Sequence, residues 1–533
     1  MKTRKRIFYT FTFIFLFGLL ACNKHYFRSN YRDANSLIHA TSSLPMQPFL
    51  KAHIKNGDVC ILTNNWKIDN KQKTVSGSGV KYDFNRNLIF EGELIIPIDS
   101  VAIFETNTKL NKNESDRIAA LSILASADVA LGVFCITTPK ACFGSCPTFY
   151  LQPDQNFHYA DAEGFSNAIA PSMEYFDIDA LNNTKIIDGI FNITMKNEAL
   201  ETHCVDDVKL FAVSKKINQT VYQTAKNDFF ICENFYKPAL ALAEEGDITN
   251  LLAAKDLHER FSGADENNLS AKESIFIDFK QVDAKQDLGL VINFRQTLMT
   301  TYFIYSAMGY MGDQVGDMFA LLETDENVKK QLSGGIKKEL GDIDVYLWIE
   351  SDKKWELQSG LFETGPIAVN QQILKINNKE KNANPKIKIV LNKGLWRIDN
   401  VALTNIISTA TPLSISPTAI FNKGVADEQA LNKLNDTSAY LISMPGDAFT
   451  MQFQLPEKDA DYELFLYSEG YYLEWMRSHW IKDKDLQMLH TMLLNPKKYL
   501  KMEAANYKKY ETGMEADFWN SKIDTENFSY YEN

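Results

Sequence analysis

The chain has 533 residues, of which 45% are hydrophobic and 23% are charged, and its formal net charge is −12 at pH 7. This length predicts three or four domains, and the composition is typical of packed globular protein. The acidic balance argues against nucleic acid as a partner and against broad contact with anionic lipid headgroups. Aromatic residues, at 12%, favour sheet-rich domains.

The first residues predict an export signal. The basic start MKTRKR is followed by the apolar run IFYTFTFIFLFGLLA and then by Cys22. A charged start before an apolar run of roughly 7–15 residues is typical of a signal peptide. The sequence Leu-Leu-Ala-Cys at 19–22 resembles the bacterial lipobox, in which the cysteine is acylated and becomes the first mature residue. We therefore predict a signal peptide over 1–21 and lipidation with palmitate at Cys22, against an ordinary secretory signal with a chance cysteine.

This anchor predicts where the protein is located. Two or three acyl chains on Cys22 would hold the chain to a lipid bilayer, whereas one chain binds only marginally. The tether over 22–46 is basic and aromatic, and it lacks the acidic run that often follows the acylated cysteine of surface lipoproteins in Bacteroidota. We expect an outer-membrane lipid-anchored protein that faces the periplasm, with the cell surface as the alternative, and an outer-membrane protein as its partner.

Residues 47–112 predict a small SH3-like β barrel. Asn56 and Gly57 form the strongest two-residue hairpin signal between short strands. Residues 113–137 then predict an apolar helix, which is either buried at an interface or spans a membrane. Asp128 lies in the middle of this run, where a charge costs about 3 kcal/mol on insertion, so a buried helix is favoured.

The remaining sequence predicts mainly β structure with helical segments, an α+β fold with one or two β-sandwich or jelly-roll domains. Alternation and turn signals indicate strands through most of it, including a strand over 288–305. Apolar spacing also predicts helical structure over 234–265 and a helical insert over 308–339. The expected domains are a cysteine-containing β domain over 138–233, a sandwich-like domain with its helical insert over 234–408, β strands over 409–470 and a helical C-terminal tail over 471–533.

Cys142 and Cys146 lie in the segment KACFGSCPTFY. Because exported proteins fold where thiols oxidise, a structural disulfide between these two cysteines is the favoured interpretation. A copper site is the second, in which two soft thiolates would be joined by His158 or His203. An active thiol pair is the third, although it normally uses Cys-x2-Cys at a helix start. Unpaired buried thiols are the fourth.

Two further groups of polar residues are candidates for sites. Glu201 and His203 would share one face of a strand, where they form either an exposed polar face or a carboxylate–imidazole metal pair. The exposed face is the simpler interpretation. Arg397 and Asp399 also share a strand face and are expected to form an ion pair. The chain lacks the Gly-x-Ser-x-Gly, His-Glu-x-x-His, Walker and dinucleotide-binding motifs, which favours a non-catalytic role without a cofactor.

Several blocks resemble a family of uncharacterised exported bacterial lipoproteins of the Bacteroidota type. They are CFGSCPTFY within 140–150, NEALETH at 197–203, GLWRIDNVAL at 394–403 and GYYLEWMRSHW at 470–480. The resemblance covers about 49–519 and implies an exported, β-rich protein with several domains. It implies no reaction.

These expectations favour a membrane-anchored lipoprotein that acts as a non-catalytic binding or scaffold component of an outer-membrane complex. A carbohydrate-binding lipoprotein is the first alternative, because β-sandwich domains with exposed Trp and Tyr commonly stack on sugars. A copper-handling accessory protein that uses Cys142 and Cys146 is the second.

Overall fold

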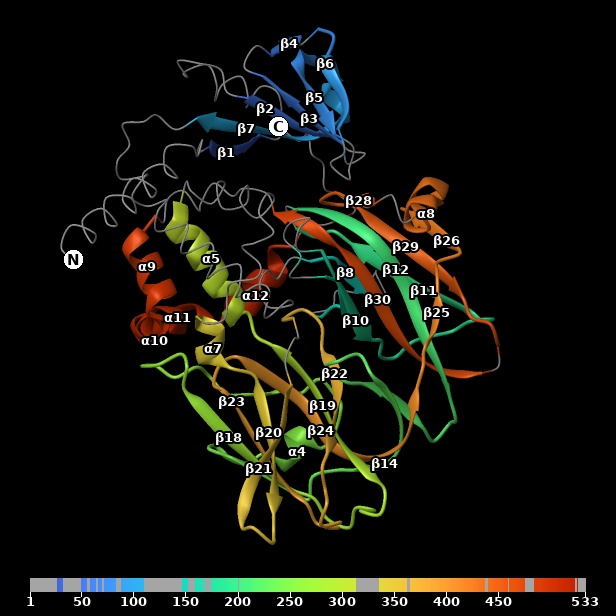
Figure 1. Cartoon of the computed structure of the whole chain (residues 1–533), viewed down its shortest axis with the longest axis vertical. Helices are drawn as coiled ribbons and strands as arrows, with labels where there is room; N and C mark the ends of the chain where they lie inside the picture. Colours follow the sequence, from blue (N-terminus) through green and yellow to red (C-terminus); the bar gives the residue numbers. More distant parts are fainter. Residues whose placement is uncertain are drawn as a thin grey trace, which may run out of the picture. The chain divides into compact units, whose positions relative to one another are not determined.

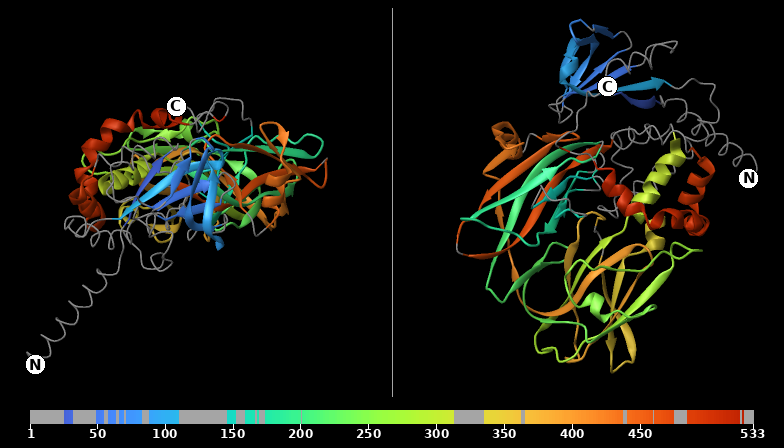
Figure 2. Two further views of the ribbon diagram at one scale, coloured as in Figure 1. Left: turned by 90° about the horizontal axis from the view of Figure 1, so that it is seen from above. Right: turned by 180° about the vertical axis from the view of Figure 1, so that it is seen from behind.

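The computed structural model divides the chain into two compact units, which are described separately (Figures 1 and 2). The described part of the first unit ends at Lys109, and that of the second begins at Cys146. The residues that the structure describes are 26–31, 49–54, 58–63, 66–69, 71–82, 88–109, 146–151, 159–165, 168, 174–199, 201–312, 335–361, 365–436, 440–458, 460–474, 484–522 and 525.

The first unit is an antiparallel sheet built around β5 (Thr74–Tyr82). One edge of β5 pairs with β3 and β4 in turn, and its other edge pairs with β6. The full order is β1-β7-β2-β3-β5-β4, with β6 added to β5. The other strands are β1 (Tyr26–Tyr31), β2 (Phe49–Ile54), β3 (Val59–Leu62), β4 (Lys67–Asp69), β6 (Leu88–Pro97) and β7 (Val101–Lys109), with a short 3-10 helix over Ile98–Ser100.

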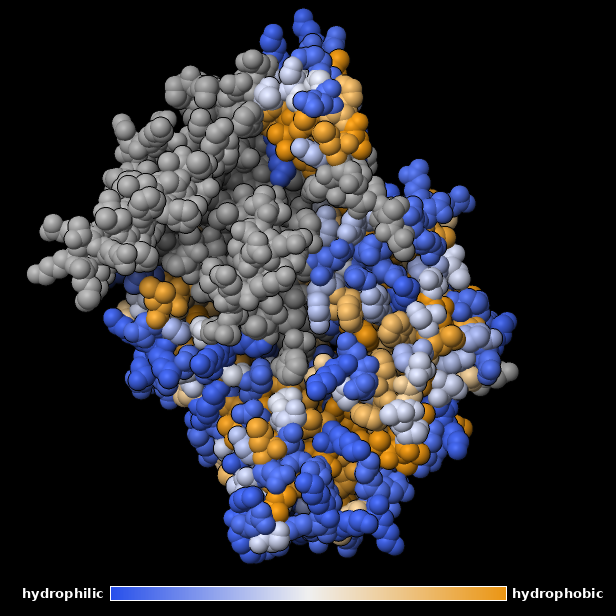
Figure 3. All heavy atoms as spheres, viewed as in Figure 1, coloured by the Kyte–Doolittle hydropathy of each residue, from blue (hydrophilic) through white to orange (hydrophobic). Residues whose placement is uncertain are grey.

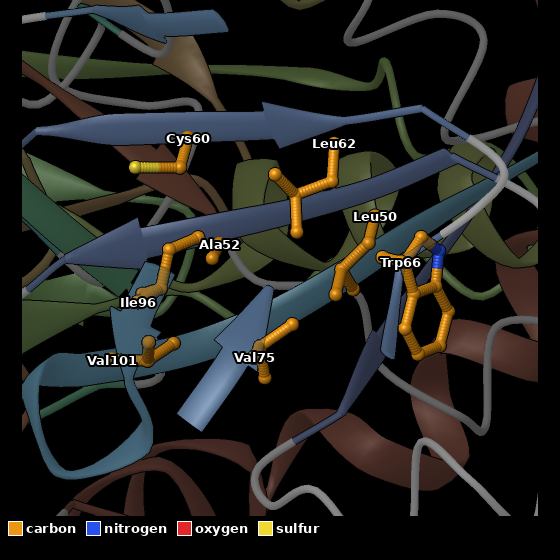
Figure 4. Close-up of a cluster of buried hydrophobic side chains, with 8 residues drawn as sticks. All are labelled: Leu50, Ala52, Cys60, Leu62, Trp66, Val75, Ile96 and Val101. Carbon is orange, nitrogen blue, oxygen red and sulfur yellow. The ribbon is translucent and has the colours of Figure 1, made fainter. Parts of the chain in front are cut away.

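Alternating side chains give this sheet one apolar face. Leu50 and Ala52 on β2, and Cys60 and Leu62 on β3, are two residues apart and therefore point to the same side. They pack with Trp66, Val75, Ile96 and Val101 in one core (Figure 4). The edge strand β6 also leaves large apolar side chains exposed, at Leu88, Ile89, Phe90 and Ile95. Figure 3 shows an apolar patch on this unit.

The second unit begins with two antiparallel sheets that form a β-sandwich. One contains β10 (Tyr175–Ala180), β12 (Glu201–Lys215), β25 (Leu413–Ile415), β28 (Leu441–Ser443) and β30 (Asp461–Glu474). The other contains β8 (Thr148–Tyr150), β9 (Ala162–Glu163), β11 (Ile190–Lys196), β26 (Ala419–Asn422), β27 (Val425–Ala426) and β29 (Ala448–Gln454). A β-bulge between Val205 and Asp207 inserts one residue into β12. The inner face therefore continues from His203 and Val205 to Val208 and Leu210.

Two further sheets follow in the same unit. The first contains β13 (Thr220–Gln223), β14 (Phe229–Tyr236), β17 (Arg260–Phe261), β19 (Asp287–Gln296), β22 (Asn370–Ile376) and β24 (Trp396–Ala410). The second contains β15 (Leu240–Ala243), β16 (Gly246–Asp247), β18 (Lys272–Asp278), β20 (Ile343–Ile349), β21 (Lys354–Leu361) and β23 (Lys386–Asn392). Burial along β18 alternates, whereas nine consecutive residues of β19 are buried. Continuous burial indicates that β19 is covered on both faces.

Helices cover one end of these sheets in Figure 1. The helix α5 (Met299–Met311) packs with a C-terminal group made of α9 (Leu486–Leu494), α10 (Pro496–Met502), α11 (Ala504–Glu511) and α12 (Met514–Asn520). Asp485 caps α9 by accepting from two backbone amides, and Asn495 caps α10 ahead of Pro496. The remaining helices are α4 (Thr249–Leu252), α7 (Ile336–Leu340) and α8 (Glu428–Leu434).

The fold class agrees with the expectation of a mainly β chain with helical segments. The predicted apolar helix over 113–137 lies outside the described residues, as do the signal peptide and most of the tether. No helix in the described part of the chain is long and apolar enough to cross a bilayer.

Two predictions of local structure were wrong. The strand predicted over 288–305 ends at Gln296, and α5 begins at Met299, where the Thr297 hydroxyl accepts from the Met299 amide. Most of α5 is buried, and its partly exposed side chains include Tyr302, Ser306 and Tyr310, which recur every fourth residue with the period of a helix. The helix predicted over 234–265 is one turn, α4, among strands. Ala241 is fully buried while Leu242 is exposed, which is the two-residue period of a strand.

Candidate functional site

The predicted site residues are divided between described and undescribed parts of the chain. Cys22, Cys142 and His158 lie outside the described residues, so lipidation and the Cys142–Cys146 disulfide remain predictions. Cys146 and His203 are both described and buried. No disulfide joins any two of the four described cysteines, which are Cys60, Cys146, Cys204 and Cys232.

Cys146 lies beside a buried carboxylate on β9. Its thiol lies close enough to the side chain of Glu163, which is fully buried, for that carboxylate to raise the pKa of the thiol. The Glu163 Oε2 atom accepts from the backbone amides of Ile367 at 3.1 Å and Ala368 at 3.3 Å. The Glu163 amide donates to Asp179 Oδ2 at 2.9 Å, which fixes β9 against β10. The loop before β8, the strand β9 and the segment before β22 therefore meet at this carboxylate.

The pair formed by Glu201 and His203 lies on the inner face of β12. As predicted, the two side chains share one strand face, and Glu201 Oε1 is 2.5 Å from His203 Nε2. Both residues are 0% exposed, so the interpretation as an exposed polar face was wrong. At this point β12 is an interior strand between β28 and β30, and its inner face is covered. The buried Tyr472 ring on β30 meets the His203 ring edge-on, with centroids 6.3 Å apart.

The electrostatics of Cys146 disfavour thiolate chemistry. Burial, followed by the nearby Glu163 and Glu201 carboxylates, raises the pKa of the Cys146 thiol well above its ordinary value. Nucleophilic catalysis and copper binding both use the thiolate. In the described ranges, no group of three His, Cys, Asp or Glu side chains is placed to hold a metal ion. We call Cys146, Glu163, Glu201 and His203 the Cys146 site, and its geometry suits a structural role.

A larger candidate site is a cavity of about 600 Å³ between α5, α11 and α12, which we call the tyrosine groove. The aromatic residues that line it are Tyr302, Tyr305, Tyr310, Tyr510 and Phe518. The polar residues that line it are Thr301, Ser306, Glu503, Asn506, Asp517 and Ser521. Cavities of this size that combine apolar walls with a few converging polar groups are typical of small-molecule sites.

Glu503 is the fixed polar group of the groove. It is 4% exposed, and its Oε1 atom accepts from the Tyr302 hydroxyl and from Asn506 Nδ2, the latter at 2.8 Å. Burial, together with the Glu503 carboxylate, raises the pKa of Tyr302. Burial also raises the pKa of Tyr310 to about 12, with Glu503 again contributing. These hydroxyls therefore stay protonated and can donate to Glu503 or to a ligand.

A buried ion-pair network holds α12 at the wall of the groove. Arg295 on β19 is 2% exposed and reaches Glu259 with two bonds of 2.7 Å. It also reaches Glu515 on α12 with two bonds, of 3.1 and 3.2 Å. Arg397 on β24 binds the same Glu515 at 2.8 Å, so the expected pair of Arg397 with Asp399 does not form. Asp399 instead accepts from the Asp256 amide at 3.3 Å.

The helix α12 also packs toward the Cys146 site. Phe518 and Trp519 contact the buried cluster that contains Cys146 and Tyr150. Just beyond the helix, Lys522 binds Glu198 at 2.9 Å, and the same carboxylate accepts from the Tyr150 hydroxyl at 2.7 Å. One short helix therefore touches both candidate sites.

Sequence reasoning missed the tyrosine groove. Its signal was present in the spacing of Tyr302, Tyr305, Ser306 and Gly309, which places all four on one helical face. The abundance of β-branched and aromatic residues in this stretch favoured a strand instead. The second wall lies about two hundred residues further along the chain, at Glu503 and Asn506, and no local pattern connects the two.

Comparison with known proteins gives little further information. No protein-family model and no curated protein matches the chain. Among solved structures, 44% of the chain is similar to 33% of BuGH86 in complex with neoagarooctaose, with 7% identity and a TM-score of 0.16. A second similar structure is BpGH86A, a β-porphyranase of glycoside hydrolase family 86 from the human gut bacterium Bacteroides plebeius. The match covers 46% of this chain and 37% of BpGH86A, with 7% identity and a TM-score of 0.17. The chain thus spans about a third of the length of these proteins.

Proposed function

We propose that this protein is a lipid-anchored, non-catalytic binding protein of the bacterial cell envelope, and that its tyrosine groove binds a carbohydrate. The observation that carries the proposal is the lining of the groove, where aromatic rings alternate with hydroxyl, amide and carboxylate groups. Sugars present flat C–H faces that pack on aromatic rings and hydroxyls that pair with such polar groups. An outer-membrane protein partner and a periplasm-facing orientation belong to the same proposal.

The polar groups of the groove are arranged before any ligand arrives. Asn506 Nδ2 donates both to Glu503 Oε1 at 2.8 Å and to the Tyr302 hydroxyl at 3.1 Å. Because these groups hold one another, little side-chain entropy is lost when a ligand binds them. A preorganised acceptor on rigid helices supports binding of one defined sugar unit.

The test of the binding site uses Tyr510, which lines the groove yet is 54% exposed. Tyr510→Ala should weaken binding of any glycan retained on an array by about tenfold, because one ring of stacking area is worth about 1.5 kcal/mol. The affinity is measured by calorimetry on the detergent-solubilised full chain. Phe276→Ala is the matched control, because Phe276 is 44% exposed and lies on β18, outside the groove. Equal losses of affinity in the two variants would contradict binding at the groove. Release of reducing sugar from the bound glycan would contradict a non-catalytic role.

The proposed anchor has its own test. Cys22→Ser should abolish incorporation of radiolabelled palmitate and move the protein from the membrane to the soluble fraction, because acyl chains alone would hold it to the bilayer. Asn35→Ser, in the same tether, should leave both readouts unchanged. Membrane retention of the Cys22→Ser protein would show that another segment anchors it.

A further inference from the structure

The charged side chains of the described chain that line the tyrosine groove are all acidic. Two carboxylates line it, Glu503 and Asp517, and no lysine, arginine or histidine of the described chain does. From this arrangement we infer that the groove selects a saccharide that carries a protonated amino group, over its neutral and acidic counterparts. This inference rests on the proposed function, because it names the chemical class of the sugar in the same groove.

Glu503 provides the strongest argument. A carboxylate that is 4% exposed loses most of its hydration, and such a charge is normally balanced by a cation or by several donors. The groups that donate to Glu503 in the described structure are neutral, namely the Tyr302 hydroxyl and the Asn506 amide. An ammonium group entering the groove would supply the opposite charge and form a charge-assisted hydrogen bond.

The aromatic lining favours the same kind of ligand. Tyrosine and phenylalanine rings attract cations to their faces through the ring quadrupole, by about 0.5–2 kcal/mol according to solvation. Tyr302 and Tyr510 stand close together, with ring centroids 6.0 Å apart. Aromatic rings and a buried carboxylate that line one cavity suit an amine, and the hydroxyls of Thr301, Ser306 and Ser521 in the same lining suit the hydroxyls of a sugar.

Two described lysines close to groove residues do not neutralise the groove. Lys509 Nζ is 3.3 Å from Asn506 Oδ1, but Lys509 is exposed and does not line the cavity. Lys522 lies over the Phe518 ring and is already paired with Glu198 at 2.9 Å. A uronic acid or sulfated sugar would therefore face Glu503 and Asp517 without a counter-charge from the described residues of the lining.

The experiment compares two oligosaccharides that differ only in acetylation. Calorimetry on the solubilised full chain at pH 6 should show at least about tenfold tighter binding of the β-1,4-glucosamine tetramer than of its N-acetylated form, because only the free amine forms charge-assisted bonds. Asp517→Asn, at an exposed position, should reduce this preference severalfold, and Glu503→Gln should remove most of it. Glu266→Gln, an exposed acid outside the groove, should change neither affinity.

The outcomes separate the two proposals. Equal affinities for the two tetramers, with binding that Tyr510→Ala still weakens, would overturn the amine inference and leave carbohydrate binding in place. A preference for the amine that survives both acidic substitutions would overturn the role of Glu503 and Asp517. Binding of neither tetramer would also overturn the inference, and the glycan array with Tyr510→Ala would then decide whether another sugar occupies the groove.

Discussion

Replacing Arg295 with methionine is expected to lower the free energy of unfolding by about 3–5 kcal/mol, because it removes one partner from a buried ion pair. The side chain of Glu259, 4% exposed, would lose both of its 2.7 Å bonds to the guanidinium and remain buried with its charge. Glu515 would keep Arg397 but lose its two bonds to Arg295. Urea unfolding followed by tryptophan fluorescence measures the change.

Two further variants separate the ion pair from loss of packing. Arg295→Met combined with Glu259→Met should recover much of the loss, because it also removes the buried carboxylate, which the single variant would leave with only the more distant Arg397, at 3.9 Å. Lys375→Met breaks an exposed pair with Asp287 and should cost at most about 1 kcal/mol. A loss below that level for Arg295→Met would show that the buried network contributes little to stability.

The same network predicts a dependence on pH. Burial alone would raise the pKa of Glu515, but the Arg295 and Arg397 guanidinium groups outweigh it and hold this pKa below its ordinary value. A carboxyl whose folded pKa is lowered stabilises the fold above its unfolded pKa, and this contribution is lost as the pH falls through the folded pKa. Arg295→Met should therefore make stability less sensitive to acid in that range.

Local patterns were sufficient for much of the β structure, and the reason lies in how the strands are buried. In β18, Ile275 and Ile277 are fully buried while Phe276 between them is exposed, so the period of two is visible in the sequence. The helix α5 shows where this fails. Its threonine and tyrosine residues favour a strand, yet its packing against the C-terminal helices outweighs local propensity.

The candidate site was less accessible to sequence reasoning, because its residues are distant in the chain. The shared face of Glu201 and His203 follows from strand geometry, but their complete burial depends on β28 and β30, more than two hundred residues later. The shared strand face of Arg397 and Asp399 predicts an ion pair between them, whereas Arg397 binds Glu515 on α12. Ion pairs between distant elements carry no local signal, and the same holds for the two walls of the tyrosine groove.

The Cys146 site gives the second large prediction, Gly365→Ala. A Cβ atom at Gly365 would lie 1.9 Å from Glu163 Oε1, so the carboxylate must move. A glutamate side chain ordinarily moves easily, but this one is fully buried and accepts from the amides of Ile367 and Ala368. Overpacking combined with lost acceptors should lower the free energy of unfolding by about 3 kcal/mol. Gly360→Ala is the control, because its Cβ would meet only ordinary contacts at 3.7 Å.

A second readout links this change to the thiol. Because Glu163 lies beside Cys146, displacement of the carboxylate should make the buried thiol more accessible. Labelling of Cys146 by iodoacetamide in the native variant should then be faster than in the parent protein. Peptide mass spectrometry identifies the labelled cysteine. Glu163→Ala removes the carboxylate that the new Cβ atom would meet, so adding Gly365→Ala to it should lower the free energy of unfolding little further. A double-mutant cycle measures this coupling. Additive losses would mean that Gly365 acts on stability through contacts other than Glu163.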